Sequence, residues 1–442
     1  MRILAAIVVF LFCAAPAFAS APKALDIGPG EQVWFEEDHT VPMVAVTVAL
    51  PAGSVYDPAN KAGLAAFAAY MFNEGAGEYS SVAYQAAVAN LGMQLSMSPD
   101  RDYLVLSFTT LSSHAKEAFR LFALALQKPH FDADAVARVR AQMLQSLQQD
   151  AQEPATIALN RFYQAFFGDH PYAHPVNGDA AGLNAISAAD LKAFAATHWV
   201  RNGTRLTVSG DIDTAMLTAL LKSTFDPLPA TAPPPPPPVT HTGPPGLIVV
   251  AMDVPQPTAI FGLPGMLRSD KDYLAGYVAN HIVGGGDFSS RLTHEVREKR
   301  GLTYGVSQVF GDFRLAGYVI GQVATRRDSM SRSLEVIRNV LAEYAAHGPT
   351  EAELRDAKTY LTGSYPLAFS SNVGVAAQLN AFQRAGLDID YVTSRNSRIN
   401  ALTLADVRRA AARIFDPKRE IVVVAGTLPS PAPQKSRKPT KA

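Results

Sequence analysis

The sequence predicts an α+β fold built from two similar domains, each a largely antiparallel sheet packed with α-helices. Two observations lead to this prediction. Segments from the two parts of the chain resemble one another at a nearly constant offset, and strands are mixed with long amphipathic helices rather than alternating regularly with them. The length of 442 residues is sufficient for two such domains, each with its own core.

The internal resemblance rests on two pairs of segments. Residues 186–210 align without a gap on residues 402–426, and each predicts a helix with a Ser or Thr N-cap followed by a short apolar strand that ends in Gly. Residues 132–136 align on residues 350–354, and each predicts a cap and a long helix. We interpret the two pairs as a duplication, with chance similarity of helix–strand units as the alternative.

The individual elements follow from hydrophobic periodicity, which is two in strands and 3.6 in helices. The same kinds of element recur in the two halves. We expect strands at 44–50, 103–111, 247–252 and 317–323, and helices at 115–127, 134–149, 331–344 and 351–362.

The first 19 residues predict a signal peptide. Arg2 precedes an apolar run that extends to Ala15, and Ala17-Phe18-Ala19 matches a small-residue cleavage motif. A transmembrane anchor is the alternative, but Pro16 interrupts the run before it reaches the ~20 residues that a span needs. We therefore expect cleavage near Ala19 and Ser20 and a periplasmic location.

A Pro-rich segment separates the two predicted domains. Residues 229–246 include six consecutive prolines, which fit neither a helix nor an inner strand. We expect an N-terminal domain at 20–228, this linker, and a C-terminal domain at 247–428. Residues 429–442 are rich in Pro and Lys and predict a disordered tail.

Composition excludes several classes of function. The 39 basic and 39 acidic residues balance, which argues against a nucleic-acid or anionic-membrane partner. The one cysteine, Cys13, lies in the predicted signal peptide, so neither disulfides nor a thiolate metal site is expected. No later apolar run has membrane length, so we expect no span in the mature chain.

Residues 60–71, NKAGLAAFAAYM, resemble the helix that carries the inverted zinc motif H-x-x-E-H in the pitrilysin/insulinase-type metallopeptidases, or inverzincins. The resemblance is to the branch that includes mitochondrial processing peptidase. It implies that two His ligands and a Glu base would stand at Ala66, Tyr70 and Ala69, and a third ligand, Glu, near Ser146. Alanine has no donor atom, and a phenol with a pKa near 10 is a poor zinc ligand. We therefore expect no zinc or other cofactor in this chain.

Residues 289–305, SSRLTHEVREKRGLTYG, closely resemble the family's substrate-binding segment, in which an Arg and a Tyr seven residues later clasp the bound peptide. The resemblance assigns these roles to Arg297 and Tyr304. Ser290 and Gly301 predict the start and end of a short helix, and Tyr304 begins an extended run to Phe310. The alternative is that Arg297 belongs to a solvated charged helix and Tyr304 to the core.

The resemblance covers nearly the whole mature chain, and heterodimers occur in the family. It implies a non-catalytic, substrate-binding subunit of a periplasmic zinc metallopeptidase that cleaves peptides. A homologous partner bearing H-x-x-E-H would supply Zn²⁺ and the general base. One alternative is a catalytically dead scaffold or peptide-holding protein without such a partner. Another is an enzyme with a relocated active site.

Overall fold

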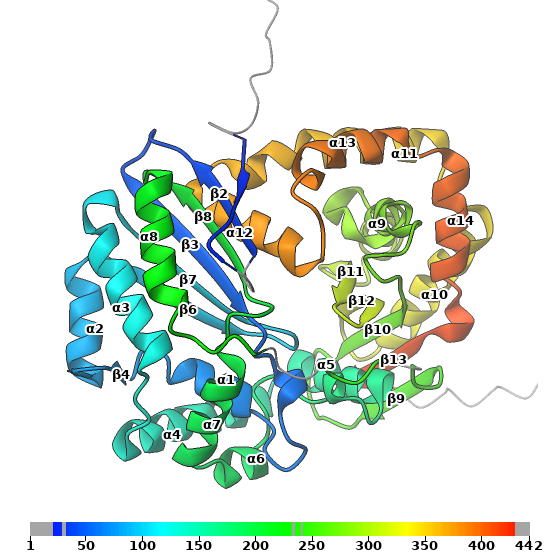
Figure 1. Ribbon diagram of the computed structural model, residues 1–442. Coiled ribbons are helices and arrows are strands. Elements are labelled where there is room, and N and C mark those ends of the chain that lie inside the picture. Colours follow the sequence, from blue (N-terminus) through cyan, green and yellow to red (C-terminus); the bar gives the residue numbers. More distant parts are fainter. Residues whose placement is uncertain (1–20, 29–31, 232–234, 240–241, 429–442) are drawn as a thin grey trace, which may run out of the picture.

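A computed structural model describes residues 21–28, 32–231, 235–239 and 242–428, and Figure 1 shows its two halves side by side. The predicted signal peptide and C-terminal tail lie outside the described residues. Within them, each half contains one large sheet and a set of helices, so the predicted fold class is confirmed.

The N-terminal half contains a six-stranded sheet with the order β1-β2-β8-β3-β7-β6, in which only β2 and β8 are parallel neighbours. A two-stranded hairpin, β4-β5, lies apart from it. The strands are β1 (Lys23–Leu25), β2 (Gln32–Glu37), β3 (Met43–Leu50), β4 (Gly75–Ala76), β5 (Tyr79–Ser80), β6 (Gln94–Pro99), β7 (Leu104–Leu111) and β8 (Arg205–Gly210). The helices are α1 (Leu64–Tyr70), α2 (Ser81–Asn90), α3 (Ala115–Gln127), α4 (Ala133–Asp150), α5 (Pro154–Phe167), α6 (Ala180–Ala185), α7 (Ala188–His198) and α8 (Thr214–Phe225).

The C-terminal half repeats this topology with a five-stranded sheet. Its order, β9-β13-β10-β12-β11, matches β2-β8-β3-β7-β6 strand for strand, and β9 and β13 are again the parallel pair. The strands are β9 (Gly246–Val250), β10 (Thr258–Pro264), β11 (Val306–Phe313), β12 (Ala316–Ala324) and β13 (Ile421–Ala425). The helices are α9 (Tyr273–Asn280), α10 (Met330–His347), α11 (Glu351–Gly363), α12 (Asn372–Arg384), α13 (Tyr391–Ala401) and α14 (Leu404–Ile414).

The aligned segments occupy equivalent places in the two halves. Ser187 at the start of α7 and Thr403 at the start of α14 each form a complete capping box with an Asp three residues later. Thr350 does the same for α11. Asp132 stands at the equivalent position before α4, but its side chain caps no backbone N–H. The shared topology and matching caps are the physical basis of the repeat.

Each sheet has one face covered by helices of its own half and the other face covered by a helix from the opposite half. Helix α5 packs on β10 and β13, whereas α12 packs on β3 and β8. In Figure 1 the orange helix α12 accordingly lies against the blue and green strands of the N-terminal sheet. The two halves are therefore held together by an exchange of helices.

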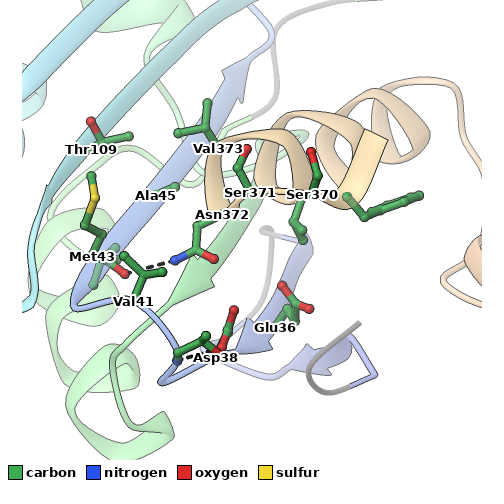
Figure 2. A pocket seen from close by; sticks show the side chains of 14 residues that line it. Glu36, Asp38, Val41, Met43, Ala45, Thr109, Ser370, Ser371, Asn372 and Val373 are labelled. Carbon is green, nitrogen blue, oxygen red and sulfur yellow. Dashed lines mark hydrogen bonds between the residues drawn. The ribbon is translucent and has the colours of Figure 1, made fainter. Parts of the chain in front are cut away.

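The exchanged helices are fixed by close packing and by side-chain hydrogen bonds. On α5, Phe162 is fully buried, and a Cβ added to Gly262 of β10 would come within 2.4 Å of its ring. On α12, Asn372 donates to the Met43 carbonyl at 3.2 Å beside a cavity of about 330 Å³, as Figure 2 shows. Asn380 and Gln383 add hydrogen bonds to carbonyls of the same sheet, so polar side chains hold the helix along its length.

The described part of the Pro-rich segment runs beside α5. His170 lies 2.8 Å from the Pro237 carbonyl through Nε2, and the Gly243 N–H donates to the Phe166 carbonyl at 2.8 Å. Pro236 is buried. The segment therefore follows the surface of the exchanged helix before β9 begins at Gly246.

Candidate functional site

The helix that resembles the zinc-binding helix is α1, and a buried carboxylate fixes its start. Asp57 is 7% exposed and accepts the N–H groups of Gly63 and Ala65, each at 2.8 Å. Gly63 has a φ of +96°, and a Cβ there would lie 2.8 Å from the Asn177 carbonyl. A glycine is required at this position because both the backbone conformation and the close approach of the chain exclude a side chain.

The positions of the family's zinc ligands and base are distributed unevenly around this helix. Ala66 and Ala69 are fully buried, with 0% of either exposed. Tyr70 is half-buried, and its hydroxyl donates to Asn177 Oδ1 at 3.2 Å. Ser146 on α4 is exposed.

These residues do not fit a zinc ion. The two alanines offer no donor, and burial raises the pKa of Tyr70, which keeps its phenol protonated at neutral pH. Within the described ranges, no three His, Cys, Asp or Glu side chains gather where they would hold a metal. The residues of this helix therefore support no zinc chemistry.

The Arg/Tyr segment lies between α9 and β11 in the chain and begins with a helical turn. Residues Thr293–Glu298 form a π-helix, and Ser290 Oγ accepts the Thr293 N–H at 3.3 Å at its start. The turn is followed by Gly301, whose φ is +58°. The helix begins directly after Ser290, as predicted, but it ends at Glu298, three residues before Gly301, and the strand β11 starts at Val306, two residues after Tyr304.

The loop that carries Tyr304 is held by hydrogen bonds of its neighbour Thr303. The Thr303 hydroxyl lies 2.6 Å from the Ala324 carbonyl and 2.9 Å from the Gly305 carbonyl, and it accepts the Gly305 N–H at 3.1 Å. Tyr304 itself is 92% exposed, so the core alternative for this residue does not hold. The backbone around Tyr304 is thus fixed, while its phenol side chain is exposed to solvent.

Arg297 differs from the other charged residues of its turn. Glu295 is paired with Lys299 and Arg300, each at 2.6 Å, and Glu298 is paired with His294 at 2.8 Å. These three contacts fit the solvated charged helix that was the alternative interpretation.

The Arg297 side chain takes no part in that ion-pair network. Its guanidinium carbon lies 4.7 Å from the ring centroid of Phe288, and Phe288 is 70% exposed. No ion pair or hydrogen bond of this guanidinium occurs among the side chains that the structure describes. Its N–H donors are free for a ligand. The Phe288 contact could not be predicted from the sequence, because a separation of nine residues follows no simple helical or strand spacing.

Within the part of the chain that the structure covers, no helix is both long and apolar enough to cross a membrane.

Two family models match ranges of this chain that contain the α1 segment and the Arg/Tyr segment. The family model "Insulinase (Peptidase family M16)" matches residues 32–180, and the model "Peptidase M16 inactive domain" matches residues 185–361. A Helicobacter pylori protein named "non-peptidase homolog YmxG" is 25% identical over 378 residues, which is 85% of this chain and 87% of that protein.

Two solved structures show the same fold. A Pseudomonas fluorescens protein described as a peptidase M16 inactive domain is 30% identical and has a TM-score of 0.88. The match covers 94% of this chain and 100% of that one. A Helicobacter pylori protein described as a protease has a TM-score of 0.83 at 18% identity, with 92% of this chain and 99% of that one covered. The chain therefore belongs to the insulinase-type peptidase family M16.

Proposed function

We propose that this chain is the non-catalytic, substrate-binding subunit of a periplasmic heterodimeric zinc metallopeptidase that cleaves peptides. The observation that carries the proposal is the guanidinium of Arg297, which has no ion pair within the described residues, together with a Tyr304 side chain that is 92% exposed, in a chain whose zinc positions hold Ala66, Ala69, Tyr70 and Ser146. The name of the Helicobacter pylori relative, a non-peptidase homolog, supports the loss of catalysis.

The chemistry would be divided between two chains. A partner with an intact H-x-x-E-H motif would bring Zn²⁺, which activates water and polarises the scissile carbonyl. Arg297 and Tyr304 carry N–H and O–H donors that suit peptide carbonyls or a carboxylate. Their contribution would be to hold and orient the peptide rather than to make or break a bond.

The test is reconstitution with a partner. The chain is co-purified with the H-x-x-E-H protein that accompanies it in the source cell, and cleavage of an unfolded polypeptide is measured. Arg297→Ala and Tyr304→Phe should raise KM about tenfold or more, while the two chains still co-elute. An unchanged KM in Arg297→Ala would remove the proposed role.

The scaffold alternative makes a different prediction for the same experiment. If the chain only holds peptides, no cleavage appears with any H-x-x-E-H partner, and a lone zinc-free chain is recovered from the cell. A relocated active site would instead give about one equivalent of zinc, or hydrolysis, in the purified single chain.

The periplasmic location is part of the proposal and has its own measurement. Mass analysis of the chain from an osmotic-shock fraction should show an N-terminus at Ser20. A full-length chain retained in the cytoplasmic fraction would contradict it.

A further inference from the structure

A second cavity, of about 650 Å³, lies between the two halves and away from the Arg/Tyr segment. Its walls come from the β6–β7 turn, the start of β8, the loop between β10 and α9, the β11–β12 turn and the C-terminal end of α12 with the residues that follow it. A volume of this size is in the range of ligand-binding pockets. Both halves of the chain therefore contribute to one site.

The charges in the cavity do not cancel. Four arginines, Arg205, Arg268, Arg314 and Arg384, line it together with two aspartates, Asp100 and Asp102, which leaves two positive charges in excess. An excess of guanidinium groups in a recess favours a carboxylate or phosphate.

Both aspartates are already occupied by protein donors. Asp100 accepts the N–H groups of Asp102 and Tyr103, at 2.7 and 2.6 Å, and the Arg384 guanidinium at 3.1 Å. Asp102 accepts the Tyr172 hydroxyl and the backbone N–H of Arg314. Neither carboxylate is left to neutralise Arg205.

Arg205 and Arg384 both carry unused donors. The Nε atom of each is buried and has no hydrogen-bond partner among the described residues, and Arg205 forms no ion pair there. Buried donors are normally satisfied, and an unpaired charged donor is the costliest kind. These two N–H groups are suited to an oxyanion.

The same wall also offers one acceptor. Gln383 is 1% exposed, and its Nε2 donates to the Gln32 carbonyl at 2.9 Å, which fixes the amide so that Oε1 is the atom without a partner. Gln32 is the register partner of Arg205 in the β2–β8 pair, so Gln383 and Arg205 stand at the same end of the sheet. The site thus has cationic donors next to a neutral acceptor.

A peptide C-terminus matches this pattern better than a simple anion. It carries a carboxylate for the guanidinium groups and an amide N–H for an acceptor such as Gln383 Oε1. Leu267, Phe313 and Leu387 supply apolar wall for its last side chain. A phosphate group would use the arginines but leave the Gln383 oxygen unmatched.

We propose that this interdomain cavity binds the C-terminal residue of a peptide through its free carboxylate. The choice of a peptide as ligand rests on the proposed function, whereas the site is separate from Arg297 and Tyr304.

The test uses the full chain and a pentapeptide that ends in leucine and carries fluorescein at its N-terminus, with binding followed by anisotropy. Amidation of the peptide C-terminus and the substitution Arg205→Met should each weaken binding at least about tenfold. Arg205→Met should leave the melting temperature of the ligand-free chain nearly unchanged, since Arg205 has no partner to lose. Arg326→Met is the matched control, because it removes an arginine whose side chain is 77% exposed, and it should bind as the native chain does.

Several outcomes would overturn the proposal. Equal binding of the amidated peptide would exclude recognition of the carboxylate, and full binding by Arg205→Met would exclude this cavity. Binding of inorganic pyrophosphate that is lost in Arg205→Met, without binding of the peptide, would identify a phosphate site instead. Loss of peptide binding in Arg297→Ala but not in Arg205→Met would overturn this site and leave the proposed function standing.

Discussion

Arg297 lies over the ring of Phe288, with its guanidinium carbon 4.7 Å from the ring centroid, while both carboxylates of its own helical turn contact other side chains. The ring holds the arginine without using its N–H donors. This contact distinguishes a side chain kept ready for a ligand from one that is merely solvated.

Phe288→Ala should weaken peptide binding without unfolding the protein. The cation–π contact at an exposed site is worth about 0.5–1 kcal/mol, so the affinity for a peptide held by Arg297 should fall about two- to fivefold. Because Phe288 is 70% exposed, the free energy of unfolding should fall by no more than about 1 kcal/mol, which is the value of the lost contact. Titration calorimetry and urea unfolding measure the two quantities. Val82→Ala, at a residue that is 79% exposed on α2, is the control, and an equal loss of affinity there would contradict the prediction.

Restoring the zinc motif one residue at a time should be costly on α1 and harmless on α4. Ala66 is 0% exposed, so Ala66→His overpacks the core and should lower the free energy of unfolding by about 1–3 kcal/mol. Ser146 is exposed, and Ser146→Glu should change the free energy of unfolding by less than about 0.5 kcal/mol. Urea unfolding compares the variants. If Ala66→His left the free energy of unfolding unchanged, the helix would still have room for a ligand.

The stability of the chain should depend on pH through Asp57. Burial raises the pKa of Asp57 to about 7 from an ordinary value of 3.8, so between these limits the folded state keeps a proton that the unfolded state releases. The free energy of unfolding therefore falls as the pH rises through this window, by at most about 1.4 kcal/mol per pH unit, and this contribution is constant above pH 7. Asp57→Asn keeps an acceptor for α1 and should remove this slope. Urea unfolding at pH 5 and pH 7.5 tests it, and equal pH dependence in both proteins would refute the assignment.

Truncating a side chain on α12 should destabilise the N-terminal half of the molecule. Leu379 is 0% exposed and shares a cluster with Trp34 of β2, so Leu379→Ala should cost about 2–5 kcal/mol. The chain's two tryptophans, Trp34 and Trp199, both lie in the N-terminal half, so their fluorescence reports its unfolding.

The control lies on the same helix. Val373 is 52% exposed, and Val373→Ala should leave the unfolding midpoint unchanged. A native midpoint for the Leu379→Ala variant would mean that α12 is not essential to the sheet that it covers.

Elements with strong periodicity and clear ends were predictable from the sequence. Helix α3 runs over the predicted residues, and the capping boxes at Ser187 and Thr403 locate α7 and α14 to the residue. Local sequence determines such features, since a cap and an apolar face act within a few turns.

The exchange of α5 and α12 was not predictable in this way. An amphipathic pattern shows that Phe162 or Leu379 is buried, but it does not show which sheet buries it. The cavity at Arg205 and Gln383 could not be predicted from the sequence either, because the residues of its walls are far apart in the chain. The roles assigned to Arg297 and Tyr304 come from resemblance and remain predictions, although the exposure of Tyr304 and the free donors of Arg297 fit them.

The exchange of helices also sets the order in which the protein can mature. The last central strand of the first sheet, β8, ends at Gly210, yet its cover α12 begins only at Asn372. At a synthesis rate of roughly 5–20 residues per second, that sheet face waits on the order of ten to thirty seconds for its cover. During this interval the nascent N-terminal half cannot bury the sheet face that α12 covers in the finished molecule, so this face stays open to other chains until the second half has been made.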